Sequence, residues 1–90
     1  MQVRSGVHTA LSDDGGALLD ERTGRWHQLT RPAAIAVHLL ASEPPEEAVN
    51  RYAEWLPERA EYAALDLAAA EEALRTRGLL AEGRRRRWWL

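Results

Sequence analysis

The residues of this chain that could take part in chemistry are few and scattered. The three histidines, His8, His27 and His38, belong to the residue type most often used as a general acid or base and as a metal ligand. There is no cysteine, which excludes thiolate chemistry and disulfide bonds. The alternative that His8 and His27 face one another across strands and bind a metal is not favoured, because a zinc site needs a third ligand and no carboxylate is spaced to supply it. No metal and no cofactor is therefore expected.

The other acid–base candidates have simpler explanations. His38 lies among leucines of a predicted helix with no nucleophile spaced to meet it, which favours a solvated or hydrogen-bonded histidine over a general base. Asp13 and Asp14 precede two glycines, and this pattern is typical of a turn. Glu71 precedes Arg75 by four residues on a predicted helix, the spacing of a surface ion pair. The sequence therefore predicts a protein that is not an enzyme.

Size and composition limit the number of domains and the kinds of site that the chain can form. Ninety residues, 46% of them hydrophobic, make one small domain with a modest core and no room for a deep enclosed cavity. Residues 1–8 lack the apolar stretch of a secretory signal, and no apolar run is long enough to cross a bilayer. Together with the absence of cysteine, these features predict a soluble protein in the cytoplasm.

Charge is unevenly distributed along the chain. The formal net charge is −2, but residues 84–87 are four arginines, so residues 1–83 carry eight arginines against fourteen acidic residues, a net charge of −6. An acidic body of this kind repels the phosphate backbone of nucleic acids. Residues 81–90 are predicted to be a basic and aromatic tail. A solubilising end is favoured over a tail that binds an acidic partner, nucleic acid or an anionic membrane, or that packs back on the domain.

Three strands are predicted before any helix. Val7 to Ser12 is the first, and Asp13-Asp14-Gly15-Gly16 is a turn before the second, Ala17 to Asp20. Arg22-Thr23-Gly24 then closes a hairpin, because glycine readily takes the positive φ that such a turn needs. The third strand, Arg25 to Leu29, contains no proline, so its outer edge is able to pair with another chain.

Three helices follow the strands. The first begins at Thr30 as N-cap with Pro32 in its first turn, and Pro57 separates the second from the third. Gly78 ends the third and longest helix, after which Leu79-Leu80 is expected to fold back onto the core. The expected helices run from Thr30 to about Ala41, from Pro44 to Trp55, and from about Glu58 to Arg77.

Three groups of residues occur in an order that is more specific than any group alone. They are Leu18-Leu19-Asp20 with Thr23-Gly24-Arg25-Trp26 and Leu29 in the hairpin, the alanine-rich helix Pro32 to Leu40, and Asp66-Leu67 with Leu74, Gly78, Leu79 and Leu80 at the end. With this order over residues 7–80, the chain resembles the PqqD-like RiPP recognition elements, small domains that bind the leader peptides of ribosomally made, post-translationally modified peptides. A free-standing, cysteine-free version is most similar to the discrete leader-binding proteins of lasso peptide biosynthesis.

The resemblance implies an α+β, winged-helix-like fold over residues 1–80, with a three-stranded antiparallel N-terminal sheet before a three-helix bundle. It also implies a non-catalytic function: the leader lies as an extra antiparallel strand on the third strand, with the third helix as the other wall, and is presented to a leader peptidase and a cyclase. The residues implied as the peptide-binding site are Arg25, Trp26, His27, Gln28, Leu29, Tyr62, Asp66, Leu67, Ala70 and Leu74.

The third helix departs from the family pattern at one point. Where relatives carry a bulky aromatic residue and a leucine, this chain has Ala68-Ala69-Ala70 and Glu71. One hypothesis is that these small residues accept a large side chain of the leader, an aromatic or proline ring, while Asp66 bonds to a polar group of the leader. The alternative is that the alanines only allow close packing against the sheet. Trp26 has two alternatives as well, lining the groove or covering the sheet.

A winged-helix regulator that binds nucleic acid is the alternative function. The order of the elements and the basic tail are compatible with it. The predicted third helix, however, is acidic to neutral, whereas a recognition helix needs exposed arginine. Binding that falls steeply with salt would favour this alternative, and salt-tolerant binding of a leader would favour peptide recognition.

Overall fold

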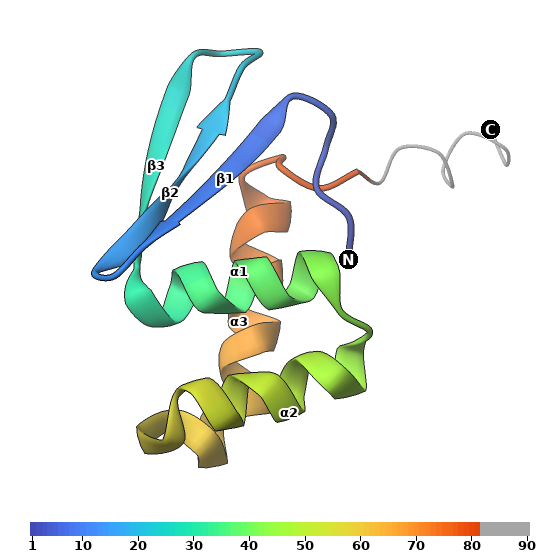
Figure 1. Cartoon of the computed structure of the whole chain (residues 1–90). Helices are drawn as coiled ribbons and strands as arrows, with labels where there is room; N and C mark the ends of the chain where they lie inside the picture. The colour runs from blue at the N-terminus through green and yellow to red at the C-terminus, as the bar shows by residue number, and fades with distance from the viewer. Residues whose placement is uncertain (82–90) are drawn as a thin grey trace, which may run out of the picture.

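The polypeptide forms a three-stranded sheet first and its helices afterwards, as the sequence predicts (Figure 1). The computed structural model describes residues 1–81; the predicted tail, from residue 82 on, lies outside them. The elements are β1 (Val7–Ser12), β2 (Gly15–Asp20), β3 (Arg25–Thr30), α1 (Arg31–Ser42), α2 (Pro45–Trp55), the 3-10 helix η1 (Pro57–Tyr62) and α3 (Ala63–Thr76). The predicted α+β fold, with an antiparallel sheet before the helices, is confirmed.

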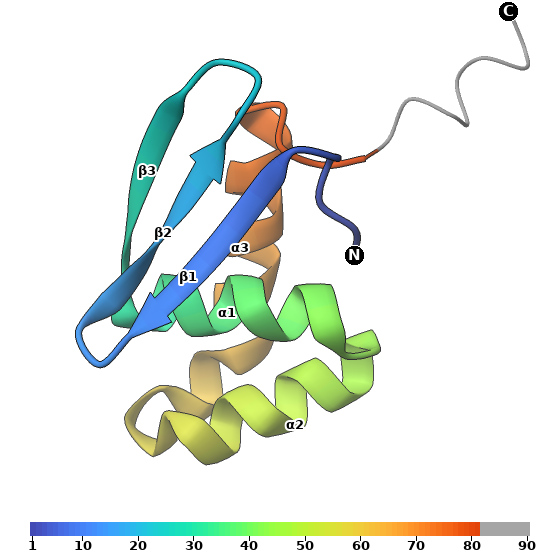
Figure 2. The ribbon, with the colours of Figure 1, turned by 45° about the horizontal axis from the view of Figure 1, so that its top comes forward.

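The sheet has the order β1-β2-β3, so β3 is one of its two edges (Figure 2). Asp20 pairs with Arg25 across the hairpin, and Gly24 takes the predicted positive φ, 73°. The loop between them is closed by hydrogen bonds to Asp20, whose carbonyl oxygen accepts the N–H of Gly24 at 2.8 Å and whose Oδ1 accepts the N–H of Arg22 at 3.1 Å. These local bonds set β3 beside β2 in a single register.

β2 begins two residues earlier than predicted. Gly15 and Gly16, interpreted as turn residues, pair with the end of β3. A Cβ atom at Gly16 would lie 2.9 Å from the Cβ atom of Ala34 and 2.5 Å from the carbonyl oxygen of Ala10. Glycine is therefore needed at this position because α1 crosses the sheet closely there.

The helices begin and end as predicted except for the third. Thr30 caps α1, its Oγ1 accepting the N–H of Ala33 at 3.3 Å. The expected continuous helix from Glu58 is wrong in its first part, because Pro57–Tyr62 is a 3-10 helix and α3 begins only at Ala63. Leu56 and Ala63, on either side of this segment, are both buried. The tighter turn lets the chain reverse direction while both side chains enter the core.

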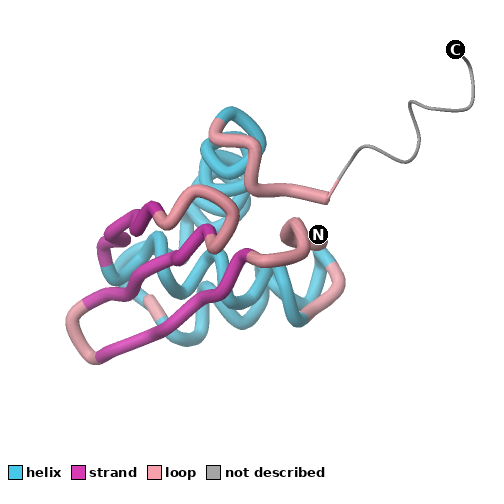
Figure 3. The backbone as a smooth tube through the Cα atoms, turned by 90° about the horizontal axis from the view of Figure 1, so that it is seen from above, coloured by secondary structure: helices cyan, strands magenta, loops and turns pink. Residues whose placement is uncertain are grey.

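The core has two parts. One lies between α1, α2 and α3 around Tyr52, which is fully buried, and the other lies under the sheet around Leu18, also fully buried. Leu79 and Leu80 fold back onto the second part as predicted. Seen from above, the segment after α3 runs to the side of the N-terminal segment (Figure 3), where Val3 forms an antiparallel bridge with Leu80.

Candidate functional site

The outer edge of β3 faces α3 across an open space. No Cα atom of α3 lies within 8 Å of a Cα atom of β3. Within residues 1–81, β3 pairs with β2 alone, so no described segment covers the other edge. Neighbouring strands lie about 4.8 Å apart. The edge therefore offers unpaired backbone groups and room for one more extended chain.

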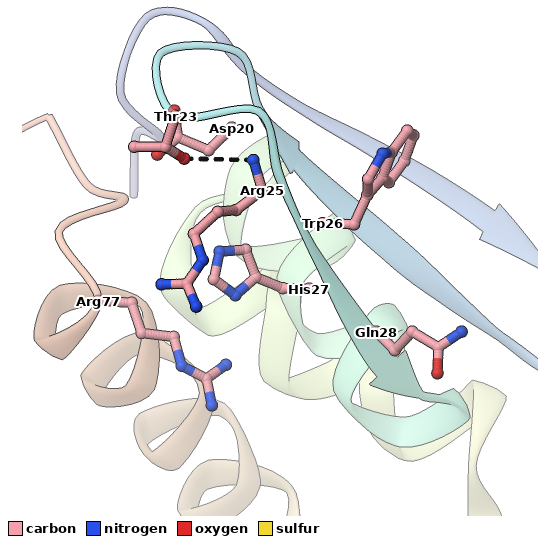
Figure 4. Close-up of a pocket in the computed structure, with 7 residues that line it drawn as sticks. All are labelled: Asp20, Thr23, Arg25, Trp26, His27, Gln28 and Arg77. Carbon is pink, nitrogen blue, oxygen red and sulfur yellow. Dashed lines mark hydrogen bonds between the residues drawn. The ribbon is translucent and has the colours of Figure 1, made fainter.

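Two clefts lie along this space, one near each end of β3. The first, of about 460 Å³, lies between the start of β3 and the end of α3, and we call it the Arg77 cleft (Figure 4). Its lining residues are Asp20, Thr23, Arg25, Trp26, His27, Gln28 and Arg77. The second, of about 390 Å³, lies between the start of α1 and the middle of α3, and we call it the Ala70 cleft. Its lining residues are Thr30, Pro32, Ala33, Ala36, Tyr52, Arg59, Asp66, Ala69, Ala70 and Ala73.

The side chains of β3 alternate between the two faces of the sheet. Figure 4 shows Arg25 and His27 on the side of α3, whereas Trp26 and Gln28 point away from it. Trp26 is 64% exposed and stands opposite Leu19, so it lies over the outer face of the sheet at the border of the Arg77 cleft. All five predicted β3 residues thus lie on the open edge, with only alternate side chains directed toward α3.

α3 contributes three alanines to the wall of the Ala70 cleft. Ala70 and its neighbours line the Ala70 cleft, and α3 has no Cα atom within 8 Å of any strand, so the alanines do not serve close packing against the sheet. Leu67 and Leu74 are buried in the two parts of the core and line neither cleft. Tyr62 also lies outside both clefts, with the Arg59 guanidinium 4.8 Å from its ring centroid. Of the four hydrophobic residues predicted from this helix region, only Ala70 reaches a cleft.

Some lining residues were not predicted, although the sequence contains a signal for them. Ala69 lies three residues after Asp66, and Ala73 lies four residues after Ala69, so the three residues share one face of a helix. Pro32 and Ala33 belong to the opposite wall, on α1. Only tertiary structure reveals that the first turn of α1 faces the middle of α3.

Asp66 is held by two other side chains. Its Oδ2 accepts hydrogen bonds from the Tyr52 hydroxyl and from Arg59 Nε, and its Oδ1 accepts one from Arg59 Nη2 at 2.8 Å. The hydrogen bonds from Arg59 lower the pKa of Asp66, against partial burial, and Tyr52 lowers it further. Burial and the bond to Asp66 raise the pKa of Tyr52 to about 12. Asp66 thus links α2, η1 and α3 at the Ala70 cleft. A polar group of a leader that bonded to Asp66 would share its carboxylate with Tyr52 and Arg59.

This cluster makes stability depend on pH at the alkaline end. The ordinary pKa of tyrosine is 10.0 and that of Tyr52 is about 12. The folded state favours the neutral phenol of Tyr52. The contribution of this phenol to the free energy of unfolding is therefore complete below pH 10 and is lost as the pH rises from 10 to 12. We expect the melting temperature to fall across this window, and to fall less in Tyr52→Phe, by circular dichroism. An equal decline in both proteins would contradict the assignment.

The Arg77 cleft is positively charged. Its acidic lining residue, Asp20, is paired with Arg4, whose Nη2 lies 2.7 Å from Oδ2. Burial acts to raise the pKa of Asp20, but the hydrogen bonds from Arg4 and from the backbone of Arg22 outweigh it and leave that pKa lowered. Arg25 and Arg77 have no ion-pair or side-chain hydrogen-bond partner within residues 1–81. The cleft therefore contains two uncompensated cations.

The histidines lie apart from one another. The disfavoured arrangement, in which His8 and His27 face one another across strands, does not occur. β2 lies between the two histidines, and they pair with its successive residues Leu19 and Leu18, whose side chains point to opposite faces. His8 Nε2 instead lies 3.0 Å from Oε2 of Glu21. In the described part of the chain, no three possible metal ligands come together, and no helix is long and apolar enough to span a membrane.

Two solved structures are similar to this chain over nearly its whole length. One is TbiB1 in complex with the TbiA(beta) leader peptide, with a TM-score of 0.74 and 28% identity, covering 92% of this chain and 96% of that chain. The other is a lasso peptide synthetase B1 complexed with the leader peptide, with a TM-score of 0.68 and 27% identity, covering 90% of this chain and 96% of that chain. No protein-family model matches the chain, and no curated protein sequence matches it significantly.

Proposed function

We propose that this chain, a PqqD-like RiPP recognition element of the lasso peptide B1 type, binds the leader peptide of a ribosomally made precursor as an added strand on β3. The observation that carries the proposal is the open edge of β3 beside α3, in the fold of two proteins that hold leader peptides. β3 is six residues long, about 20 Å, and the Arg77 cleft is lined by its first four residues and the Ala70 cleft by its last.

Backbone pairing alone does not give useful affinity. About four hydrogen bonds at roughly 1 kcal/mol each barely offset the cost of ordering the peptide and of its lost translational freedom. One or two buried apolar side chains, at roughly 1.5 to 3 kcal/mol each, would bring binding into the micromolar range. The Ala70 cleft supplies such a site, because alanines wall it on both α1 and α3. A large leader side chain, an aromatic or proline ring, would fit there.

The proposed role is binding without catalysis. Holding the leader in extended form would raise the effective concentration of the rest of the precursor at a leader peptidase and a cyclase in the cytoplasm. Residues 1–80 would be the binding unit. A nucleic-acid-binding role is not favoured, because α3 carries Glu71 and Glu72 on its surface, both paired with Arg75, rather than a row of arginines.

Nuclear magnetic resonance tests where a peptide binds. The 15N-labelled chain would be titrated with the TbiA(beta) leader peptide and with the N-terminal half of any short precursor encoded beside its own gene. We expect shifts and slowed amide exchange along β3 and α3, with β1 unchanged, and little loss of affinity between 50 and 300 mM salt (about twofold). A scrambled peptide of the same composition is the control. Protection of β1 instead of β3, or preferential binding of an oligonucleotide with a steep salt dependence, would overturn the proposal.

A further inference from the structure

We propose that the Arg77 cleft binds an acidic side chain of the peptide, and thereby fixes the direction and register of the peptide on β3. This inference rests on the proposed function and adds to it the chemistry of one contact. Backbone pairing by itself is independent of sequence, so an added strand can slip along the edge unless its side chains specify one position.

The Arg77 cleft contains positive charge that the described residues do not balance. Arg25 and Arg77 both direct their guanidinium groups into it (Figure 4), and neither has a partner within residues 1–81. The acidic residue of the cleft, Asp20, is already bonded to Arg4. Glu21, which follows Asp20 in the chain, does not line the cleft, and its Oε2 lies 3.0 Å from His8 Nε2. Two like charges facing one space repel each other, and a carboxylate placed between them would bind both with charge-assisted hydrogen bonds.

The backbone N–H at the Arg25 end of β3 is already hydrogen-bonded. The N–H of Arg25 donates to Thr23 Oγ1 at 3.2 Å, within the hairpin loop. This donor is therefore occupied and cannot pair with a peptide. At the Arg25 position, the carbonyl oxygen and the side chain are left to contact a peptide, so the charged side chain is the group there that can distinguish one peptide residue from another.

The spacing of the two clefts along β3 favours one direction of the peptide. The Arg77 cleft lies at the Arg25 end of β3 and the Ala70 cleft at the Thr30 end. Residues four apart on one face of a strand are separated by about 13 Å. In an antiparallel peptide the large side chain for the Ala70 cleft comes first, and the acidic residue follows about four residues later. A peptide in the opposite direction would present this pair in reverse order.

A peptide carboxylate suits the cleft better than a nucleic-acid phosphate does. Residues 1–83 carry a net charge of −6, so a polyanion that reached the two arginines would also meet repulsion from the rest of the domain. A single carboxylate on an otherwise uncharged segment avoids that repulsion. The cleft also lies directly beside the strand edge, where an alternate side chain of an added strand would point.

A display selection tests the inference and does not require the leader sequence. Random 12-residue peptides would be selected on the full 90-residue chain and on Arg25→Gln/Arg77→Gln, with Arg51→Gln as control, since Arg51 is exposed on α2 and lines neither cleft. We expect peptides selected on the parent to carry Asp or Glu three to five residues after a large apolar residue. Changing that acid to its amide should weaken binding to the parent and to Arg51→Gln by about tenfold, and leave binding to the double variant unchanged.

The possible failures are distinguishable. If selected peptides protect β3 but show no acidic preference, or keep it on the double variant, the inference is wrong and the proposed function stands. If a 12-nucleotide single strand displaces the peptide from the parent but not from the double variant, the cleft binds phosphate and the inference is overturned. If no peptide is enriched on any of the proteins, the proposed function fails, and the inference with it.

Discussion

Replacing Asp66 by alanine is expected to lower the melting temperature by about 10 °C. The substitution leaves the buried hydroxyl of Tyr52 without its acceptor and removes both bonds of Asp66 to Arg59. An unsatisfied buried polar group costs about 1 to 3 kcal/mol, and in a domain of this size 1 kcal/mol shifts the melting temperature by about 4 to 8 °C. Differential scanning calorimetry of the purified variant would measure the shift.

Two further variants identify the cause. Asp66→Asn keeps an acceptor for Tyr52 but loses the charge that Arg59 binds, so its melting temperature should lie between those of the parent and the alanine variant. Adding Tyr52→Phe to Asp66→Ala removes the orphaned hydroxyl and should recover part of the loss. A melting temperature for Asp66→Ala within about 2 °C of the parent would contradict the assigned role.

Replacing Ala70 by tryptophan is expected to weaken leader binding by at least about thirtyfold while the fold remains. Ala70 lies on the wall of the Ala70 cleft, whose volume is about 390 Å³. An indole side chain would occupy much of that space and exclude the large peptide side chain proposed to bind there. Losing one buried apolar side chain corresponds to roughly 2 kcal/mol. Isothermal titration calorimetry with the best-binding leader would measure the change.

The matched control lies two residues away. Ala68 is exposed, lines neither cleft and belongs to the same helix, so Ala68→Trp adds the same side chain outside the groove. It should bind the leader as the parent does. Equal weakening by both substitutions would mean that tryptophan perturbs α3 itself, and unchanged binding in Ala70→Trp would remove the Ala70 cleft from the site.

Local signals made much of the fold predictable. Gly24 takes a positive φ and Thr30 caps α1, because each effect depends on a few adjacent residues. The start of the third helix was not predictable in the same way. Its 3-10 segment depends on the burial of Leu56 and Ala63 and on the contact of Arg59 with Asp66, and these contacts form only in the folded chain.

The candidate site was predictable in outline but not in detail. The open edge of β3 followed from the strand order and from the absence of proline. Leu67 and Leu74 were assigned to the groove but are buried, because an alanine-rich helix offers two apolar faces and its spacing does not say which one meets the core. Arg77, seen in the sequence only as a helix-end residue, reaches the groove because α3 ends beside the start of β3.

The first and last described segments of the chain lie side by side. Ala81 donates its N–H to the carbonyl oxygen of Gln2 at 3.0 Å, and Arg4 Nε donates to that of Gly78 at 2.9 Å. A domain whose two ends lie close together can be inserted into a surface loop of a larger protein without distorting the fold of that protein. This fold is therefore compatible with a domain inserted in a larger protein as well as with a separate polypeptide.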